Sequence, residues 1–318
     1  MVICTYSEAR WHDLVRAVQS VQQQTCRARE LIIVVDHNPH LLTRIRQEFG
    51  AVTVVENRQA PGLSGARNTG LASSTASVIA FLDDDASAAP DWVERLMAGY
   101  QDARVMGVGG YVEPVWETSR PRWFPPEFDW VVGCSYAGLP KKPSEVRNLL
   151  GCNMSFRRDV FDGVGGFRTG IGRIGAYPVG CEETELCIRA SQAWPERSFR
   201  YEPGARVTHQ VPAARATWTY FRSRCYAEGS SKALISHFIG TADGLASERR
   251  HTLRTLPSGV ARELARVLLR RDLAGLARAA AIVGGLAFTA AGFVAGSWGQ
   301  RQEPIRTAIE ASREARVG

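Results

Sequence analysis

The first part of the chain alternates between short apolar runs and segments in which apolar side chains recur at helical spacing. The apolar runs, which we expect to be strands, are Val2–Tyr6, Leu31–Val35, Val52–Val55 and Val78–Leu82. The segments between them, which we expect to be helices, span residues 7–24, 39–49 and 63–73. A run that is apolar at nearly every position is typical of a strand buried on both faces, and strands that alternate with helices at this spacing build βαβ units. We therefore predict an α/β fold around a parallel sheet.

The middle of the chain is less regular, and its end is helical. We expect strands at Val105–Val112, Asn153–Phe156 and Tyr201–His209, and a helix over Glu182–Ala193. From about Trp218 the pattern is helical. The chain is thus predicted to have a strand-containing body followed by a helical C-terminal region.

Three consecutive carboxylates, Asp83, Asp84 and Asp85, directly follow the apolar run Val78–Leu82. Open α/β sheets bind their ligands at the carboxyl ends of the strands. Adjacent carboxylates repel one another, and a divalent cation that carries a diphosphate would relieve this repulsion. The alternative interpretation is a solvated turn or a helix cap, because Asp is common in both.

A second acidic cluster, Glu182-Glu183 with Glu185, stands at the start of the predicted helix over residues 182–193. The helix dipole favours acidic residues in a first turn, so one interpretation is that the cluster serves only the helix. The functional interpretation is a general base that deprotonates an acceptor hydroxyl. The residues by themselves leave both interpretations open.

Two further residues are candidates for a nucleotide pocket. Arg67 lies in the string Gly65–Gly70 near the start of a predicted helix, and Asp36 ends the second apolar run. Small residues such as those around Arg67 also serve simple packing of a helix on a sheet, and an Asp after a strand is often a turn former.

These residues, in this order, closely resemble the family 2 glycosyltransferases of GT-A fold. The strings that carry the resemblance are Val2–Tyr6, Val34–Asp36, Gly65–Gly70, Phe81–Asp85, Gly151–Arg158, Gly165–Phe167 and Glu182–Leu186. They lie between Val2 and about Lys232. The resemblance implies a Rossmann-like mixed sheet flanked by helices over residues 1–232, with residues 233–318 as a helical C-terminal appendage.

The resemblance also implies an activity, the inverting transfer of a sugar from a nucleoside diphosphate to an acceptor hydroxyl. The residues that it places at the donor are Thr5, Tyr6, Glu8, Asp36, Arg67, Asp83 and Asp84. Asp85 would hold Mg²⁺ or Mn²⁺ against the diphosphate, and His209 matches a late histidine that reaches the metal or the diphosphate. Glu183, beside Glu182, would be the general base.

The sequence departs from the family pattern in two places. The usual Glu-Asp pair at the base is Glu182-Glu183 here, so the acid at the second position is one methylene longer. The Q/R-x-x-R-W signature of processive synthases does not occur in the corresponding region, residues 220–226. This favours a transferase that adds a single sugar.

Two groups of side chains are further candidates for substrate contacts. The loop Trp116–Trp130 is rich in aromatic residues, which either stack on an acceptor sugar or pack the loop itself. Five basic residues form the second group, and each of them either contacts a phosphate or is solvated. They are Arg157, Arg158, Arg222, Arg224 and Lys232.

The C-terminal region holds both an uncharged apolar segment and most of the excess charge. Residues 279–298 carry no charged side chain over 20 positions, which is the minimum length of a membrane span. The alternative is a hydrophobic hairpin broken at Gly284-Gly285 and docked on the enzyme or on the bilayer surface. The net charge of the chain is +7, and the tail from residue 247 has 12 Arg against six acidic residues. We therefore expect this region to meet an anionic membrane surface rather than nucleic acid.

The cysteines and the N-terminus indicate the compartment. The chain has seven scattered cysteines and no C-x-x-C pair, so neither a disulfide framework nor a structural zinc site is expected. No basic region precedes the apolar run at Val2, so we expect no signal peptide. We predict a catalytic domain at the cytoplasmic face of the cell membrane.

Three hypotheses about function remain at this point. The first is a metal-dependent, non-processive glycosyltransferase that acts on a lipid-linked or cell-envelope polysaccharide acceptor. The second is a catalytically silent partner that binds nucleotide sugars in an envelope assembly complex, against which both acidic clusters argue. The third, a basic nucleic-acid-binding protein, lacks a recognition motif.

Overall fold

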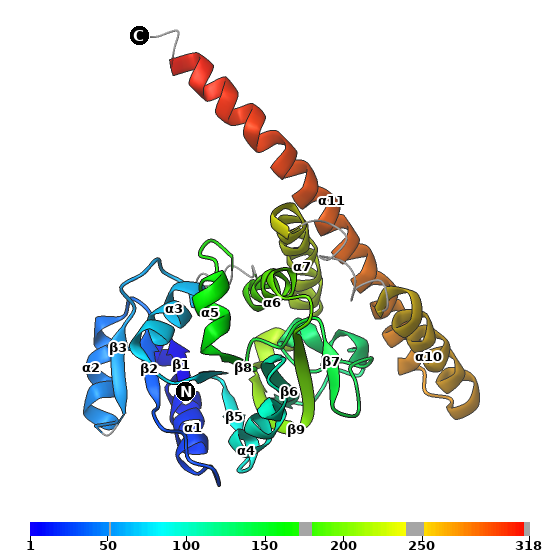
Figure 1. Ribbon diagram of the computed structural model, residues 1–318. Helices are drawn as coiled ribbons and strands as arrows, with labels where there is room; N and C mark the ends of the chain where they lie inside the picture. The colour runs from blue at the N-terminus through cyan, green and yellow to red at the C-terminus, as the bar shows by residue number, and fades with distance from the viewer. Residues whose placement is uncertain (51, 172–179, 240–250, 315–318) are drawn as a thin grey trace.

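The described residues form a mixed sheet with helices on both faces (Figure 1). The computed structural model describes residues 1–50, 52–171, 180–239 and 251–314. The order of the main strands is β3-β2-β1-β4-β8-β6-β9-β5, and β7 pairs with β9. The strands are β1 (Val2–Thr5), β2 (Ile32–Val35), β3 (Thr53–Glu56), β4 (Val78–Asp83), β5 (Ala86–Ala88), β6 (Val105–Trp116), β7 (Ser144–Val146), β8 (Asn153–Arg157) and β9 (Ser198–Val211).

The four strands predicted from the apolar runs are confirmed as neighbours in one sheet. β1, β2, β3 and β4 pair in parallel, with Ile3 beside Ile33 and Leu82. Alternate residues of β2 enter opposite cores: Ile33 joins one hydrophobic cluster, and Ile32 joins the other. Burial on both faces explains why these strands read as continuous apolar runs.

Helices cover the two faces of the sheet. The helices of the body are α1 (Trp11–Gln22), α2 (Pro39–Glu48), α3 (Leu63–Ser73), α4 (Trp92–Ala98), α5 (Arg158–Val164) and α6 (Glu182–Ala193), with short 3₁₀ turns at Glu8–Arg10, Gly99–Gln101, Pro126–Val132 and Ala213–Ala216. The core on one face includes side chains from α1, α2 and α4, and the core on the other includes side chains from α3, α5 and α6. Each face of the sheet is therefore packed.

The second half of the sheet brings a distant strand to the end of β4. β8 runs antiparallel to both β4 and β6, and β9 runs parallel to β6. The short strand β5 follows the three aspartates and pairs with β9, so that Ala86 lies opposite His209. This register places His209 beside the acidic triplet.

The C-terminal region is helical, as predicted. It contains α7 (Trp218–Ile239), a π-helical turn at His251–Thr255, α10 (Leu256–Arg270) and α11 (Ala274–Glu314). The predicted division at residue 232 falls inside α7. Within this region, residues 240–250 and 315–318 lie outside the described residues.

The hairpin considered as the alternative to a membrane span does not form, because α11 continues without a break through Gly284-Gly285. Figure 1 shows α11 as one uninterrupted helix. A side chain at Gly285 would overlap the ring of Phe128, so this glycine serves close packing and not a turn. Among the described residues, the stretch Ala274–Trp298 is long and apolar enough to cross a membrane by length and composition.

The aromatic loop packs mainly against α7. Phe124 and Phe128 are buried, and both rings lie about 5 Å from the ring of Phe221 between centroids. Trp123 contacts the rings of Trp218 and Phe221 edge-on. Packing of the loop is thus the interpretation that holds for Trp123 and Phe124. Phe128 and the half-buried Trp130 also line the cavity described below.

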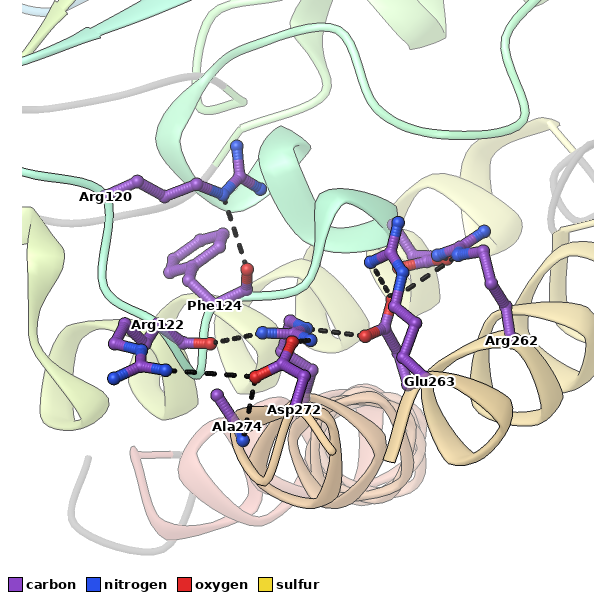
Figure 2. A network of polar contacts seen from close by, with 10 residues as sticks. Arg120, Arg122, Phe124, Arg262, Glu263, Asp272 and Ala274 are labelled. Atoms are coloured by element: carbon purple, nitrogen blue, oxygen red, sulfur yellow. Dashed lines mark hydrogen bonds and ion pairs between the residues drawn. The ribbon is translucent and has the colours of Figure 1, made fainter. Parts of the chain in front are cut away.

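A polar network joins the same loop to α10 and α11 (Figure 2). Glu263 of α10 is fully buried and accepts hydrogen bonds from Arg262, Arg266 and Arg278. Arg278 also donates to the carbonyl oxygen of Arg122 in the loop. The network fixes the α10–α11 unit to the body of the protein.

Candidate active site

A cavity of about 1100 Å³ lies at the carboxyl ends of β1, β2 and β4. The predicted site residues that line it are Thr5, Tyr6, Asp36, Arg67, Asp83, Asp84, Asp85, Glu182, Glu183 and His209. Glu8 does not line it: its side chain is exposed and lies 3.7 Å from Arg44. The structure thus brings the two acidic clusters to one cavity, although they are far apart in the chain.

Asp83, Asp85 and His209 form a cluster that fits a divalent cation. One ligand atom from each residue lies within 4.8 Å of the other two. Asp85 Oδ1 is 3.1 Å from His209 Nε2. Two carboxylates and an imidazole are a donor set that suits Mn²⁺, and Mg²⁺ through the oxygen ligands.

The charges around Asp85 compensate one another. Burial disfavours its ionisation, but His209 and Arg10 hold the pKa of Asp85 well below its usual range. Burial likewise opposes charge on His209, while Asp85 raises the pKa of His209 to about 10. His209 therefore carries a proton at neutral pH, which a metal ion bound through Nε2 would replace.

Asp84 faces a different set of partners. It is buried, accepts a 2.7 Å hydrogen bond from Thr5 Oγ1 and accepts another of 2.7 Å from Arg10 Nη1. Burial raises the pKa of Asp84 to about 6, although Arg10 opposes the shift. Both carboxylate oxygens of Asp84 and the hydroxyl of Thr5 are thus engaged within the protein.

Arg67 links the two acidic clusters. Its guanidinium, 2% exposed, donates to Glu182 at 2.6 Å, to Asp83 at 3.2 Å and to the carbonyl oxygen of Gly151 at 2.9 Å. α3 supplies the arginine, α6 supplies Glu182 and the end of β4 supplies Asp83. This buried arginine holds the start of α6 against the end of β4.

Glu183 is the half-buried member of its cluster. Burial and the adjacent Glu182 raise the pKa of Glu183 to about 8, although Arg67 opposes the shift. Glu185 is fully buried and bonds to Arg168 and Arg189 instead, and Glu182 is held by Arg67. Among the described residues, Glu182 and Glu185 each form an ion pair with an arginine, and Glu183 does not. Glu183 lines the cavity and has a raised pKa, which suits a group that exchanges a proton.

Asp36 and Tyr6 line the cavity where β2 and β1 end. Asp36 accepts hydrogen bonds from Asn57 Nδ2 at 2.6 Å and from the backbone N–H of Gly62 at 2.8 Å. These bonds fix the loop before α3. Tyr6 is 40% exposed, and its ring lies 5.4 Å from the guanidinium carbon of Arg10.

Several cavity residues were not predicted from the sequence. Arg10 lies 3.2 Å from Asp85, and Arg215, in the turn after β9, lies 3.7 Å from the same carboxylate. Glu228 of α7 also lines the cavity. Arg10 and Arg215 carry no local signal, because Asp85, the carboxylate that both of them meet, is far away in the chain. Glu228 has its ionic partners, Arg224 and Lys232, one turn away on α7.

The five basic residues considered as phosphate contacts divide into two groups. Arg224 and Lys232 line the cavity. Arg157 and Arg158 donate to backbone carbonyl oxygens of the body, and Arg222 is exposed. Only the first two are therefore placed at the site.

Comparisons with known proteins indicate the family of this chain. A sequence model of glycosyl transferase family 2 matches residues 1–165. The glucosyl-dolichyl phosphate glucuronosyltransferase of Haloferax volcanii is 39% identical over 242 residues, which cover 74% of this chain and 76% of that protein. The succinoglycan biosynthesis protein ExoM of Rhizobium meliloti is 27% identical, over 79% of this chain and 76% of that protein.

Solved structures show the same fold. The mannosyltransferase PcManGT of Pyrobaculum calidifontis, solved with GDP-Man and Mn²⁺, superposes with a TM-score of 0.59 at 18% identity, over 93% of this chain and 86% of that one. GalNAc-T7, solved with UDP, GalNAc and Mn²⁺, superposes with a TM-score of 0.50 at 18% identity. The match covers 73% of this chain and half the length of GalNAc-T7.

Proposed function

This chain belongs to glycosyl transferase family 2 and is a glycosyltransferase of GT-A fold, and on that premise we propose its reaction. It transfers one sugar, with inversion at the anomeric carbon, from a nucleoside diphosphate to a hydroxyl of a lipid-linked or cell-envelope glycan. The observation that carries the proposal is the meeting of both acidic clusters in one cavity, joined by the buried Arg67.

The donor would bind along the ends of β1, β2 and β4. Tyr6 and Asp36 would contact the base and the ribose, and Asp83 would face the ribose or the sugar. All three residues line the cavity, which supports this assignment. Thr5 and Asp84 act through their mutual hydrogen bond, which fixes Arg10 beside the diphosphate position. Arg10 and Arg215 add positive charge next to the departing diphosphate. Glu8, which the resemblance placed at the donor, lies outside the cavity, and we assign it no contact with the donor.

Asp83, Asp85 and His209 would hold Mg²⁺ or Mn²⁺. Such an ion neutralises negative charge that develops on a diphosphate leaving group. Both solved structures of this fold were determined with Mn²⁺, which supports the same class of ion here.

Glu183 would be the general base. Its carboxylate accepts the proton of the acceptor hydroxyl while the hydroxyl oxygen forms a bond to the anomeric carbon of the sugar. The bond from that carbon to the diphosphate oxygen breaks with its electron pair, and the nucleoside diphosphate leaves. Glu182, held by Arg67 at 2.6 Å, orients the first turn of α6 that carries Glu183.

The acceptor is proposed to be linked to a polyprenyl-type lipid. The Haloferax volcanii relative is named for a glucosyl-dolichyl phosphate acceptor and shares 39% identity with this chain. The stretch Ala274–Trp298 of α11 would attach the enzyme to the membrane, with the catalytic residues 1–232 on the cytoplasmic side and residues 233–318 as the membrane-associated region.

A panel of UDP-, GDP- and dTDP-sugars tests the proposal. The purified full chain is incubated with each donor and with Mg²⁺ or Mn²⁺, and release of the nucleoside diphosphate is measured with and without a lipid-linked acceptor. We expect release from at least one donor, and a loss of about a hundredfold or more in Glu183→Gln. A donor that binds without release, in every combination, would support the silent binding partner instead.

A further inference from the structure

The cavity continues past the proposed base to a half-buried cationic cluster on α7. Arg224 Nη2 and Lys232 Nζ lie 3.2 Å and 3.3 Å from different oxygens of Glu228. The three side chains are 12–16% exposed, and all three line the cavity. Burial alone would raise the pKa of Glu228, but Lys232 and Arg224 lower it, so that the carboxyl is ionised. Both cations thus contact the same carboxylate, and the formal charges of these three side chains sum to +1.

This cluster is adjacent to the start of α6. Cys181, which directly precedes Glu182 and Glu183, donates its thiol to Glu228 at 3.3 Å. The backbone N–H of Gly180 donates to Ser231 of α7 at 3.4 Å. The positive charge of α7 is therefore held next to the residue proposed to activate the acceptor hydroxyl.

The wall beyond the cluster is apolar and belongs to α11. Its lining residues are Leu286, Thr289, Ala290, Phe293 and Val294. α7 and α11 touch through their backbones, because a side chain at Gly229 would overlap the carbonyl oxygen of Thr289. Gly229 directly follows Glu228, so the cationic cluster and the apolar wall are contiguous.

The apolar wall leads to the outside of the protein. Leu286 is 37% exposed and Val294 is 61% exposed, although both also line the cavity. They lie in the stretch of α11 that is long and apolar enough to cross a membrane. An apolar chain that enters along this wall would meet the cationic cluster at its inner end.

We propose that Arg224 and Lys232 bind the phosphate of an amphiphilic acceptor whose apolar chain lies along Leu286, Ala290, Phe293 and Val294 of α11. A phosphate fits the net positive charge, since Arg and Lys are the side chains that hold phosphate in proteins. The acceptor role rests on the proposed function, because it places the sugar of such a lipid toward Glu183. The lipid site itself can be tested without any turnover.

Binding of geranylgeranyl monophosphate to the full chain in detergent tests the head-group part. Displacement of the tritiated lipid by unlabelled geranylgeranyl monophosphate, geranylgeraniol and inorganic phosphate is measured. We expect the phosphorylated lipid to bind at least tenfold more tightly than either the alcohol or inorganic phosphate. Equal binding of the lipid phosphate and the alcohol would overturn the proposal, and so would tighter binding of inorganic phosphate alone.

Substitutions on α7 locate the phosphate. Lys232→Gln removes the net charge of the cluster and should weaken geranylgeranyl monophosphate at least tenfold, while Lys232→Arg should stay within threefold of the unmodified chain. Arg222→Gln removes the same charge from an exposed position of the same helix and is the matched control. An equal effect of Lys232→Gln and Arg222→Gln would contradict the site. The thermal midpoint of each variant reports whether it is folded.

A substitution on α11 locates the chain. Ala290→Phe narrows the cavity and should weaken geranylgeranyl monophosphate at least tenfold but leave dimethylallyl monophosphate within twofold. Ala291→Phe adds the same ring at the next exposed position, which does not line the cavity, and should change neither. Equal effects of the two variants would refute the assignment of the wall. If the lipid binds but no nucleoside diphosphate is released, the lipid site stands and the proposed transferase is refuted. If nucleoside diphosphate is released but the chain does not select the phosphorylated lipid, the transferase stands and the lipid site is refuted.

Discussion

Replacement of Arg67 by Met tests whether one buried arginine holds the two acidic clusters together. Arg67 is 2% exposed, and Glu182, its partner at 2.6 Å, is 5% exposed. Met has a similar length and no charge, so that Arg67→Met removes the ion pairs with little loss of packing volume. The carboxylate of Glu182 and the carbonyl oxygen of Gly151 lose their bond to the guanidinium.

The expected cost follows from the burial of this pair. Removal of one partner from a buried ion pair costs about 3–5 kcal/mol, because the remaining charge is left uncompensated away from water. An exposed pair contributes far less, because water and salt screen the two charges. Arg95 provides the matched control, since its ion pair with Asp91 at 2.7 Å has side chains 51% and 41% exposed.

Urea unfolding of Arg67→Met, Arg95→Met and Arg67→Met/Glu182→Gln measures the difference. We expect a loss of about 3–5 kcal/mol in the free energy of unfolding for Arg67→Met, and little or no loss for Arg95→Met. The double variant should recover at least about 1 kcal/mol, because a neutral amide at position 182 leaves no buried charge without a partner. Equal losses at positions 67 and 95, or no recovery in the double variant, would refute the reasoning.

Three further predictions concern the base and the attachment of the C-terminal helices. Because the pKa of Glu183 is raised to about 8, log kcat/KM should rise with pH up to about pH 8. The free energy of unfolding should fall between pH 4.5 and 8, because the unfolded state releases a proton that the folded state keeps. A pH–rate profile that levels off near pH 4.5 would contradict the raised pKa. Glu263→Ala leaves Arg262, Arg266 and Arg278 without their shared acceptor, so the free energy of opening of α10, measured by hydrogen exchange, should fall by about 1–3 kcal/mol. Glu196→Ala, at an exposed position, should leave the exchange of α10 unchanged. Gly292→Leu should separate α11 from α7, because a side chain there overlaps the carbonyl oxygen of Tyr226, and exchange in α7 should rise while Ala291→Leu has no effect.

The first four strands were predictable because each is apolar on both faces. The two long strands β6 and β9 extend beyond their predicted ends. β6 contains Gly107, Gly109 and Gly110, which local propensity disfavours in strands. The pairing with β9 requires Gly110, since a side chain there would overlap the carbonyl oxygen of Ala205. These glycines lie inside the predicted strand Val105–Val112, so the strand itself was found, but the close approach of β9 that Gly110 permits depends on a partner far along the chain.

The acidic residues of the site were found from the sequence, together with Arg67 and His209, but the counter-charges Arg10 and Arg215 were not. Asp83–Asp85 and Glu182-Glu183 stand out because carboxylates are adjacent to one another after a strand or at a helix start. Arg10 and Arg215 meet Asp85 only through the packing of the turn before α1 and the turn after β9. The prediction of Glu8 at the donor shows the same limit, because its place one turn before α1 points it toward Arg44.

The central claim is that Asp85, with Asp83 and His209, holds the divalent cation that supports sugar transfer. The most direct measurement is the rate of nucleoside diphosphate release by the full chain and by Asp85→Asn, each treated with EDTA and then titrated with Mn²⁺. We expect that Mn²⁺ restores release in the unmodified chain and that Asp85→Asn remains at least a hundredfold slower at saturating Mn²⁺. Release that persists in EDTA, or an Asp85→Asn variant that responds to Mn²⁺ as the unmodified chain does, would contradict this claim.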